Sequence, residues 1–343
     1  MGNKNLRAAD GNKDDEFYTG YEDIKKELVN YAKYFKNKII YCNCDDHNGI
    51  GLGTPKSNFL KYLADNFEAF QIKKVIATHY EKDKQISTMY VLDKDNTGDG
   101  IICFEDIAEI PMHGNGDFRS SECIELLKQA DIVITNPPFS LFREYVAQLV
   151  KYRKKFLIIG NKNALSYKEV FSLVQSNKVW LGYNSPSDFI YKGEPTKKVT
   201  GLTRWYTNLE TSKRREFLHT GKKYYGYEDM YPHYDNYDAI NVDKVSDIPM
   251  DYAGIMGVPI TFIDKYNPEQ FKILGITKTW FGGASKIYPK QIQIDKNGNK
   301  KEVSKLNDGA TLEIEQADNQ TYYEVDGKKY IQLYARILIK RKN

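Results

Sequence analysis

Short apolar runs alternate with amphipathic segments along residues 1–182, and this alternation limits the possible fold more than any other feature. Apolar runs of strand length occupy residues 38–44, 74–80, 131–135, 155–160 and 179–182. Apolar residues at helical spacing occupy residues 21–35, 57–70, 122–129, 142–152 and 167–175. Strands that alternate with helices in this way form βαβ units. The sequence therefore predicts an α/β fold with a mostly parallel sheet, whose ligands bind where the strands end.

Residues 81–116 interrupt the alternation. They contain a turn-rich stretch, Asp95-Asn96-Thr97-Gly98-Asp99-Gly100, between two apolar runs. Two apolar runs joined by such residues are typical of a β-hairpin, which we expect within this segment.

The character of the chain changes after Gly182. Residues 183–251 are rich in Lys, Arg, Tyr, Asp and Pro and show little helix or strand pattern, whereas strand-like runs return at 258–263, 271–276 and 330–339. We predict a flexible N-terminus at residues 1–15 and a core at 16–182. An inserted or appended target-recognition region follows at 183–251, and residues 252–343 return to the core sheet and add a β-rich tail.

The tetrapeptide Asn136-Pro137-Pro138-Phe139 directly follows the apolar run 131–135. An exocyclic amine on a nucleobase is a poor nucleophile, because its lone pair is delocalised into the ring. The side-chain oxygen of Asn136 and the backbone carbonyl of Pro137 can accept hydrogen bonds from such an NH2 group and direct its lone pair at a methyl donor. The two prolines fix the loop, and Phe139 offers a flat face to an extruded base. At the end of a buried strand, this loop is predicted to be catalytic.

Four further segments are candidates for contacts with a nucleotide-like methyl donor. The loop Asn43-Cys44-Asp45-Asp46 follows the first strand and leads to Gly49-x-Gly51-x-Gly53, and a glycine-rich first turn lets the backbone approach such a ligand. Phe17-Tyr18-Thr19 precedes that strand, Tyr80 follows the second strand, and Asp117-Phe118 precedes the third. Simpler interpretations are a flexible surface loop, a helix cap at Thr19, an exposed side chain and an Asx-turn at Asp117.

The region 183–251 combines cationic side chains with tyrosines, a mixture that suits phosphate contacts and base-edge readout. The predicted DNA contacts are Arg204, Tyr206, Lys213, Arg214, Arg215, Lys222 and Lys223. The alternative is an ordinary solvated surface. The net charge of +4 permits nucleic-acid binding without indicating it.

Composition argues against several classes of protein. No apolar run approaches the ~20 residues needed to cross a bilayer, and the N-terminus has no apolar signal core. The cysteines at 42, 44, 103 and 123 have no CxxC spacing. That pattern favours free thiols in a reducing cytosol over a zinc site or a disulfide framework. We therefore expect a cytoplasmic protein that needs no metal.

Several longer segments carry a resemblance to a known family. They are EFYT (16–19), YCNCDD (41–46), SNF (57–59), GDFRS (116–120), TNPPFSLFREY (135–145), GNKNALSYKE (160–169), RWYTNL (204–209) and MGVPITFIDKYNPEQFKILG (256–275). In this order they resemble the EcoRI-type adenine-specific DNA methyltransferases, over about residues 14–285. The chain departs from that family at His47–Lys56, a stretch with three glycines before SNF.

The resemblance implies a Rossmann-like S-adenosylmethionine-dependent methyltransferase fold. It implies transfer of a methyl group from S-adenosyl-L-methionine to N6 of a flipped adenine in double-stranded DNA. Since such an enzyme can act on one strand at a time, we expect a monomer or weak dimer. The resemblance implies a catalytic role for residues 136–139. It also implies donor contacts from Tyr18 and Thr19, from Asn43–Asp46, and from Asp117 and Phe118.

The residues themselves leave alternatives open. Cytosine N4, an RNA base or a protein glutamine would suit the Asn136 loop as well, because each presents a planar NH2 group. A non-catalytic DNA-binding protein is a second possibility, although it would not need the tetrapeptide. A dehydrogenase would place its third glycine differently from Gly49-x-Gly51-x-Gly53.

Overall fold

The computed structural model describes residues 18–45, 57–81, 86–191, 194–195, 201–317 and 319–342. The predicted flexible N-terminus at 1–15, the glycines of 49–53, and the candidate residues Phe17 and Asp46 lie outside these ranges. The chain forms two compact units. The first comprises Met1–Val170 and Lys178–Thr211, and the second comprises Phe171–Asn177 and Ser212–Asn343.

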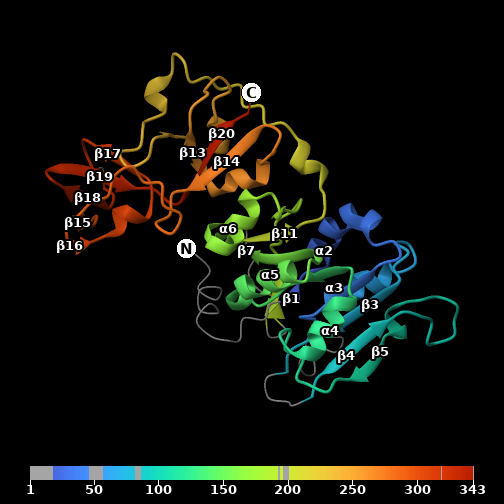
Figure 1. The fold of residues 1–343 in the computed structure, drawn as a ribbon. Coiled ribbons are helices and arrows are strands. Elements are labelled where there is room, and N and C mark those ends of the chain that lie inside the picture. The colour runs from blue at the N-terminus through green and yellow to red at the C-terminus, as the bar shows by residue number, and fades with distance from the viewer. Residues whose placement is uncertain are drawn as a thin grey trace. The chain divides into compact units, whose positions relative to one another are not determined.

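The first unit is a mixed α/β structure built on one large sheet (Figure 1). Among the described residues, this sheet has eight strands in the order β5-β4-β3-β2-β6-β7-β11-β8. The strands are β2 (Ile39–Cys42), β3 (Lys74–Thr78), β4 (Thr88–Leu92), β5 (Ala108–Pro111), β6 (Ile132–Thr135), β7 (Lys155–Asn161), β8 (Trp180–Leu181) and β11 (Thr203–Thr207). The helices are α2 (Tyr21–Leu28), α3 (Asn58–Asp65), α4 (Ser121–Gln129), α5 (Phe142–Lys151) and α6 (Lys168–Gln175), which spans the boundary between the units.

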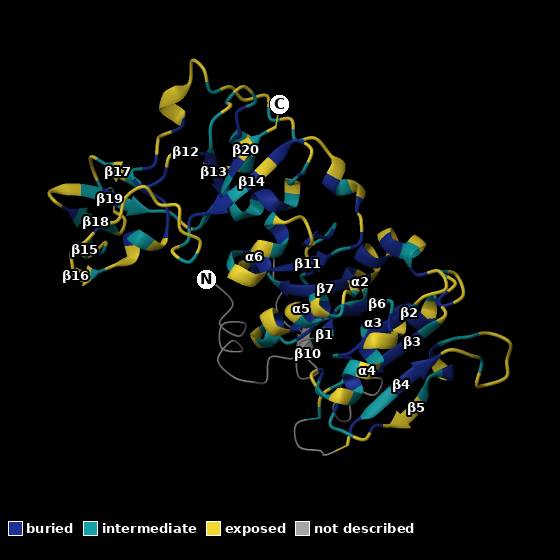
Figure 2. Cartoon of the chain, viewed as in Figure 1, coloured by how far each residue is buried: buried dark blue, intermediate teal, exposed yellow. Residues whose placement is uncertain are grey.

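Helices cover both faces of the sheet. Successive side chains of a strand point to opposite faces, so each apolar central strand has two faces to bury. Ile40 of β2 belongs to the core cluster that also holds Ile24 of α2 and Leu60 of α3. On the other face, the ring of Phe142 at the start of α5 lies 5.0 Å from that of Tyr206 in β11. The central strands are therefore buried throughout (Figure 2), which explains their continuous apolar runs.

The sheet is parallel only at its centre, so the prediction of a mostly parallel sheet is wrong. Strand β2 pairs in parallel with β3 and β6, and β6 pairs in parallel with β7. Strands β4 and β5 form an antiparallel pair next to β3, which confirms the hairpin predicted within residues 81–116. Strand β11 runs antiparallel to both β7 and β8. Residues 93–107, which join β4 to β5, contain the turn at Asp95–Gly100 and no α-helix, so they fold back instead of crossing over the sheet.

The chain changes direction across the sheet between β2 and β6. From β2 it continues to β3 on one side, and it later enters β6 and β7 on the other. The loops that follow such neighbouring strands diverge and leave a crevice, which is where α/β sheets bind ligands. The loops at this point are Asn43–Asp45 and Asn136–Pro138, both predicted to be functional.

A small second sheet brings residues distant in sequence to this edge. Strand β1 (Tyr18–Thr19) pairs antiparallel with β9 (Phe189–Tyr191), which also pairs with β10 (Glu194–Pro195). Residues 183–211 contain β9, β10 and β11. This part of the predicted recognition region therefore belongs to the first unit.

Two buried carboxylates of helix α2 hold the segment that leads into β9. Asp23 accepts hydrogen bonds from the backbone N–H groups of Ser187 and Asp188, at 2.6 and 2.8 Å. Glu27, fully buried, accepts from the backbone N–H groups of Tyr183 and Asn184, both at 2.8 Å. Because β9 pairs with β1, these carboxylates also help to place Tyr18 and Thr19.

The second unit has sheets of its own, so the predicted return of residues 252–343 to the core sheet is wrong. Its four-stranded sheet, counted over the described residues, has the order β12-β13-β20-β14, and its five-stranded sheet has the order β16-β15-β18-β19-β17. The strands are β12 (Ile240–Asn241), β13 (Met256–Pro259), β14 (Phe271–Ile276), β15 (Gln291–Ile294), β16 (Lys300–Val303), β17 (Thr311–Ile314), β18 (Tyr322–Val325), β19 (Lys328–Gln332) and β20 (Arg336–Arg341). The position next to β7 is taken by β11, which the sequence pattern did not reveal as a strand.

Two predicted strands of this unit have other bounds in the structure than those predicted. Residues Ile260–Lys265 form a 3-10 helix, so the predicted strand 258–263 ends early. The run 330–339 is divided between β19 and β20. None of the helices in the described ranges is long and apolar enough to cross a membrane.

Candidate active site

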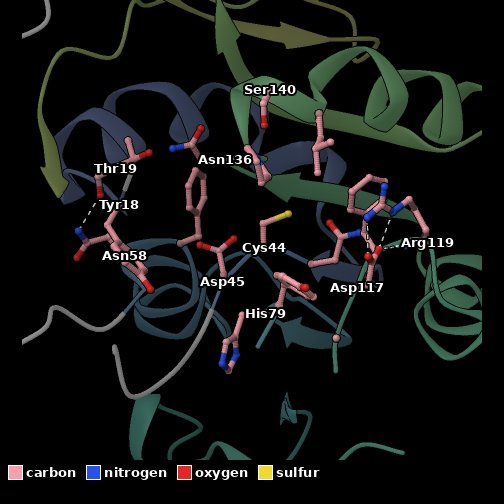
Figure 3. A pocket seen from close by; sticks show the side chains of 17 residues that line it. Tyr18, Thr19, Cys44, Asp45, Asn58, His79, Asp117, Arg119, Asn136 and Ser140 are labelled. Carbon is pink, nitrogen blue, oxygen red and sulfur yellow. Dashed lines mark hydrogen bonds and ion pairs between the residues drawn. The ribbon is translucent and has the colours of Figure 1, made fainter. Parts of the chain in front are cut away.

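A cavity of about 280 Å³ lies in the first unit where β2, β3 and β6 end (Figure 3). Its size is near the lower end of the ~300–1,000 Å³ of small-molecule sites. Predicted residues that line it are Tyr18, Thr19, Asn43, Cys44, Asp45, Tyr80, Asp117, Phe118, Asn136 and Pro138. The fold thus brings together donor candidates from four separate segments with the predicted catalytic loop.

The loop after β2 is tied to the neighbouring elements by buried hydrogen bonds. The carboxylate of Asp45 accepts from the hydroxyl of Ser57 at 2.8 Å and from that of Thr135 at 2.6 Å. Its backbone N–H donates to the carbonyl of Thr78 at 3.0 Å. Asp45 therefore links the ends of β2, β3 and β6 to the N-terminus of α3, where Ser57 caps the helix through Leu60 N–H.

Asn43 is buried, and its side-chain oxygen accepts a hydrogen bond from the hydroxyl of Tyr145 on α5. The ring of Tyr145 meets that of Phe118 edge to face, at 5.1 Å between centroids. Burial raises the pKa of the Tyr145 hydroxyl well above its usual value, so this group stays protonated.

Tyr18 and Thr19 reach the cavity from β1. The backbone carbonyl of Thr19 accepts from the side-chain amide of Asn58 at 2.7 Å, which joins β1 to the start of α3. Asn58 and Phe59 also line the cavity, although they are not among the predicted site residues. The SNF segment of the family resemblance was the signal that could have found them.

Asp117 lines the cavity as predicted, and it is also paired with a residue that the prediction missed. Its carboxylate accepts from the guanidinium of Arg119 at 2.9 and 2.7 Å, and from the Arg119 backbone N–H at 2.8 Å. The last bond is the Asx-turn considered for this position. The hydrogen bonds from Arg119 hold the pKa of the Asp117 carboxyl below its usual value, so the pair is ionised at neutral pH.

Gly116 is required by a close approach of two backbones. It has a φ of +78°, and a Cβ atom there would lie 1.9 Å from the carbonyl oxygen of His79. His79 lines the cavity beside the exposed Tyr80, and its Nε2 lies 2.9 Å from a carboxylate oxygen of Glu81. The remaining unpredicted residues that line the cavity are Ser140 and Leu141, next to the catalytic tetrapeptide.

The four residues of that tetrapeptide differ in position. Asn136 and Pro138 line the cavity, whereas Pro137 is buried beside it. Phe139 is half-buried, packs against the core cluster and is not among the residues that line this cavity. The base contact predicted for Phe139 therefore remains a prediction.

The predicted DNA contacts fall into buried and exposed groups. Tyr206 is fully buried in β11, and its hydroxyl donates to the carbonyl of Asn161 at 2.8 Å. Arg204, also on β11, is 9% exposed, and its guanidinium donates to the carbonyl of Thr203. Their assignment to DNA contact is wrong in this structure, because β11 is an inner strand of the core sheet.

In the second unit, Arg214 is buried and bonds to Asn177, and Lys213 lies 3.6 Å from Asp264. Arg215, Lys222 and Lys223 are exposed. The surface therefore keeps these three of the predicted cationic contacts. Across the described residues, no group of three or more His, Cys, Asp or Glu side chains is arranged to hold a metal ion.

Comparison with known proteins identifies the family of this chain. The model of the family "Adenine-specific methyltransferase EcoRI" matches residues 5–342. The chain belongs to this family. The type II methyltransferase M.EcoRI of Escherichia coli is 46% identical over 303 residues, which cover 80% of this chain and 90% of the relative.

Two mycoplasma relatives agree with this. The type II methyltransferase M.MgeORF184P of Mycoplasma genitalium is 38% identical and M.MpnI of Mycoplasma pneumoniae is 37% identical, each over 281 residues. The alignments cover 76% of this chain and 83% and 82% of the respective relatives. No solved structure matches the chain significantly.

The family membership establishes the chain as an adenine-specific DNA methyltransferase. It decides against the dehydrogenase, the non-catalytic DNA-binding protein, and the cytosine, RNA and protein-amide alternatives. DNA is accordingly the substrate.

Proposed function

We propose that the cavity binds S-adenosylmethionine and that the Asn136 loop presents N6 of a flipped adenine to the methyl group of that donor. One observation carries this proposal: the catalytic loop and the donor loop meet at one cavity and are joined by a buried hydrogen bond. Asn136 lines the same cavity as Asn43, and Thr135, immediately before Asn136, donates to Asp45 at 2.6 Å.

The residues around the cavity fit a polar ligand. The side-chain oxygen of Thr19 and the side-chain nitrogen of Asn43 are buried and have no hydrogen-bond partner within the described part of the chain. A buried polar atom without a partner is costly and rare in folded proteins. Phe59 and Phe118 supply apolar walls to the same cavity. This combination suits a nucleoside with a polar amino-acid arm, and the bound donor supplies an electrophilic methyl group.

At the target, the chain's own groups position the amine. The side-chain oxygen of Asn136 and the carbonyl of Pro137 accept hydrogen bonds from the N6 amino group, which turns its lone pair out of the base plane. As that nitrogen gains positive charge during transfer, the two acceptors stabilise it. Groups already oriented toward a developing charge need no rearrangement during the reaction.

The proposal extends to the fold and to the oligomeric state of the enzyme. The parallel centre of the sheet, with helices on both faces and a crevice between β2 and β6, supports a Rossmann-like methyltransferase fold. We also propose that the enzyme acts as a monomer or weak dimer on one strand at a time.

The test is methyl transfer from labelled S-adenosylmethionine to unmethylated duplex DNA, followed by nucleoside analysis. N6-methyladenine in the digest is the expected result. Label in N4-methylcytosine, or label absent from DNA despite measurable donor binding, would overturn the proposal.

A further inference from the structure

We propose that Tyr145 is a positioning residue that orients the side-chain amide of Asn43, so that its NH2 group faces the cavity and binds the carboxylate of the methyl donor. This inference rests on the proposed function, since it assumes that S-adenosylmethionine occupies the cavity. Tyr145 itself does not line the cavity, and it acts through Asn43, which does.

The contact joins elements that are distant in sequence. Tyr145 lies in α5, 102 residues after Asn43, and its hydroxyl donates to the Asn43 side-chain oxygen. The Tyr145 side chain is fully buried, and its ring packs edge to face on Phe118, which also lines the cavity. The hydroxyl therefore has little freedom to move away from Asn43.

The direction of this hydrogen bond fixes the orientation of the amide. An Asn side chain presents an acceptor oxygen on one side and a donor NH2 group on the other. With a hydroxyl donor held against the oxygen, the oxygen stays turned toward α5 and the NH2 group turns away from it. That NH2 nitrogen is a buried atom for which the described residues provide no acceptor, and Asn43 lines the cavity.

An NH2 group needs an acceptor, and this limits which part of the donor it binds. The amino groups of the donor, on its adenine ring and on its methionine part, do not offer one. The ring nitrogens of its adenine and the oxygens of its ribose are neutral acceptors, whereas its carboxylate is the anionic one, and hydrogen bonds to ionised groups are the stronger class. Thr19, whose buried hydroxyl has no partner among the described residues, lines the same cavity and can donate to the second carboxylate oxygen.

The experiment compares two donors in three forms of the full-length protein. S-adenosylmethionine and decarboxylated S-adenosylmethionine differ only in the carboxylate, and their Kd values are measured by calorimetry for wild type, Tyr145→Phe and Tyr41→Phe. Tyr41 is a matched control, because its buried hydroxyl bonds to Thr78 at 2.9 Å and neither residue lines the cavity.

We expect Tyr145→Phe to weaken binding of S-adenosylmethionine about 10-fold, as for loss of one oriented hydrogen bond. Its affinity for the decarboxylated donor should stay within about two-fold of wild type, and KM for S-adenosylmethionine should rise with little change in kcat. Tyr41→Phe should leave the ratio of the two affinities unchanged. If Tyr145→Phe does not fold, Asn43→Asp tests the contact through which Tyr145 acts, because it replaces the NH2 group by an anionic oxygen at equal size. An unchanged ratio of the two donor affinities in that variant would overturn the inference.

Equal weakening of both donors, or no weakening, would overturn the positioning role while leaving the proposed function intact. A wild-type protein that binds neither donor would instead overturn the proposed function, and this inference with it.

Discussion

The cavity of the first unit and the exposed cations of the second unit are built in different ways. Around the cavity, several polar side chains are buried and held by particular partners, as Asp45 is by Ser57 and Thr135. In the second unit, Arg215, Lys222 and Lys223 are exposed to solvent. The first arrangement depends on the exact geometry of the hydrogen bonds. Surface cations instead attract DNA electrostatically, and this attraction varies smoothly with distance and salt concentration. Single changes should therefore have large effects in the first region and graded effects in the second.

The largest effect is expected at the catalytic loop. Asn136→Ala removes one of the two acceptors for the target amine, and we expect transfer to fall by at least about 10²–10³-fold. Donor binding should be nearly unchanged. Single-turnover transfer and the donor Kd measure the two quantities separately, and near-normal turnover would contradict the assigned role.

A second comparison uses two glycines of similar backbone conformation. Gly116→Ala places a Cβ atom 1.9 Å from the carbonyl oxygen of His79, whereas Gly98, with a φ of +81°, has nothing within 4 Å. Gly98→Ala therefore measures the cost of backbone conformation alone, about 1 kcal/mol. Gly116→Ala adds a backbone clash, and we expect a loss of about 2–4 kcal/mol together with weaker donor binding.

Urea unfolding of the two alanine variants gives the free energies directly. Equal losses of stability would show that the loop can move away from His79. The prediction that single changes around the cavity have large effects would then be wrong at this position.

A third prediction concerns the pH dependence of stability. Burial raises the pKa of the Glu27 carboxyl above its ordinary 4.5. The folded state therefore holds this proton over a pH range where the unfolded state has lost it. The Glu27 contribution to the free energy of unfolding then falls as pH rises from about 4.5 through the folded pKa.

In Glu27→Gln this component is absent, so the stability difference between wild type and variant should change over that range. Urea titrations at several pH values test this, with Glu22→Gln as control, since Glu22 is an exposed residue of the same helix. A constant difference across the range would show that Glu27 does not titrate as proposed.

The smallest effects are expected at the exposed cations of the second unit. Removing one phosphate contact lowers the slope of log affinity against log salt by about 0.9. We expect Lys222→Ala, Lys223→Ala and Arg215→Ala each to weaken DNA binding a few-fold with such a change in slope. Lys128→Ala, which removes an exposed cation paired with Glu125 at 2.6 Å, serves as the control of equal charge. Unchanged slopes in all three variants would mean that DNA is bound elsewhere.

The sequence predicted the parts of the site that depend on local residue order. Asn136 and Pro138 follow a buried strand directly, and Asn43–Asp45 follow another, so strand ends and turn residues sufficed to select them. The same approach misplaced Arg204 and Tyr206, because a strand with basic and aromatic residues looks like a surface segment when its neighbours are unknown. Strand β11 is buried through pairing with β7 and β8, which are separated from it in the chain.

What the sequence determined by itself was the alternation of strands and helices, the loops that carry chemistry and the family to which the chain belongs. The tertiary structure alone decided which side chains those loops meet. Tyr145 reaches Asn43 across 102 residues, Thr135 reaches Asp45 across 90, and β9 pairs with β1 at the edge of the cavity. The physical reason is that periodicity reports which face of an element is buried. It does not report the partner against which that face packs, and the partner sets the orientation, burial and charge of each group.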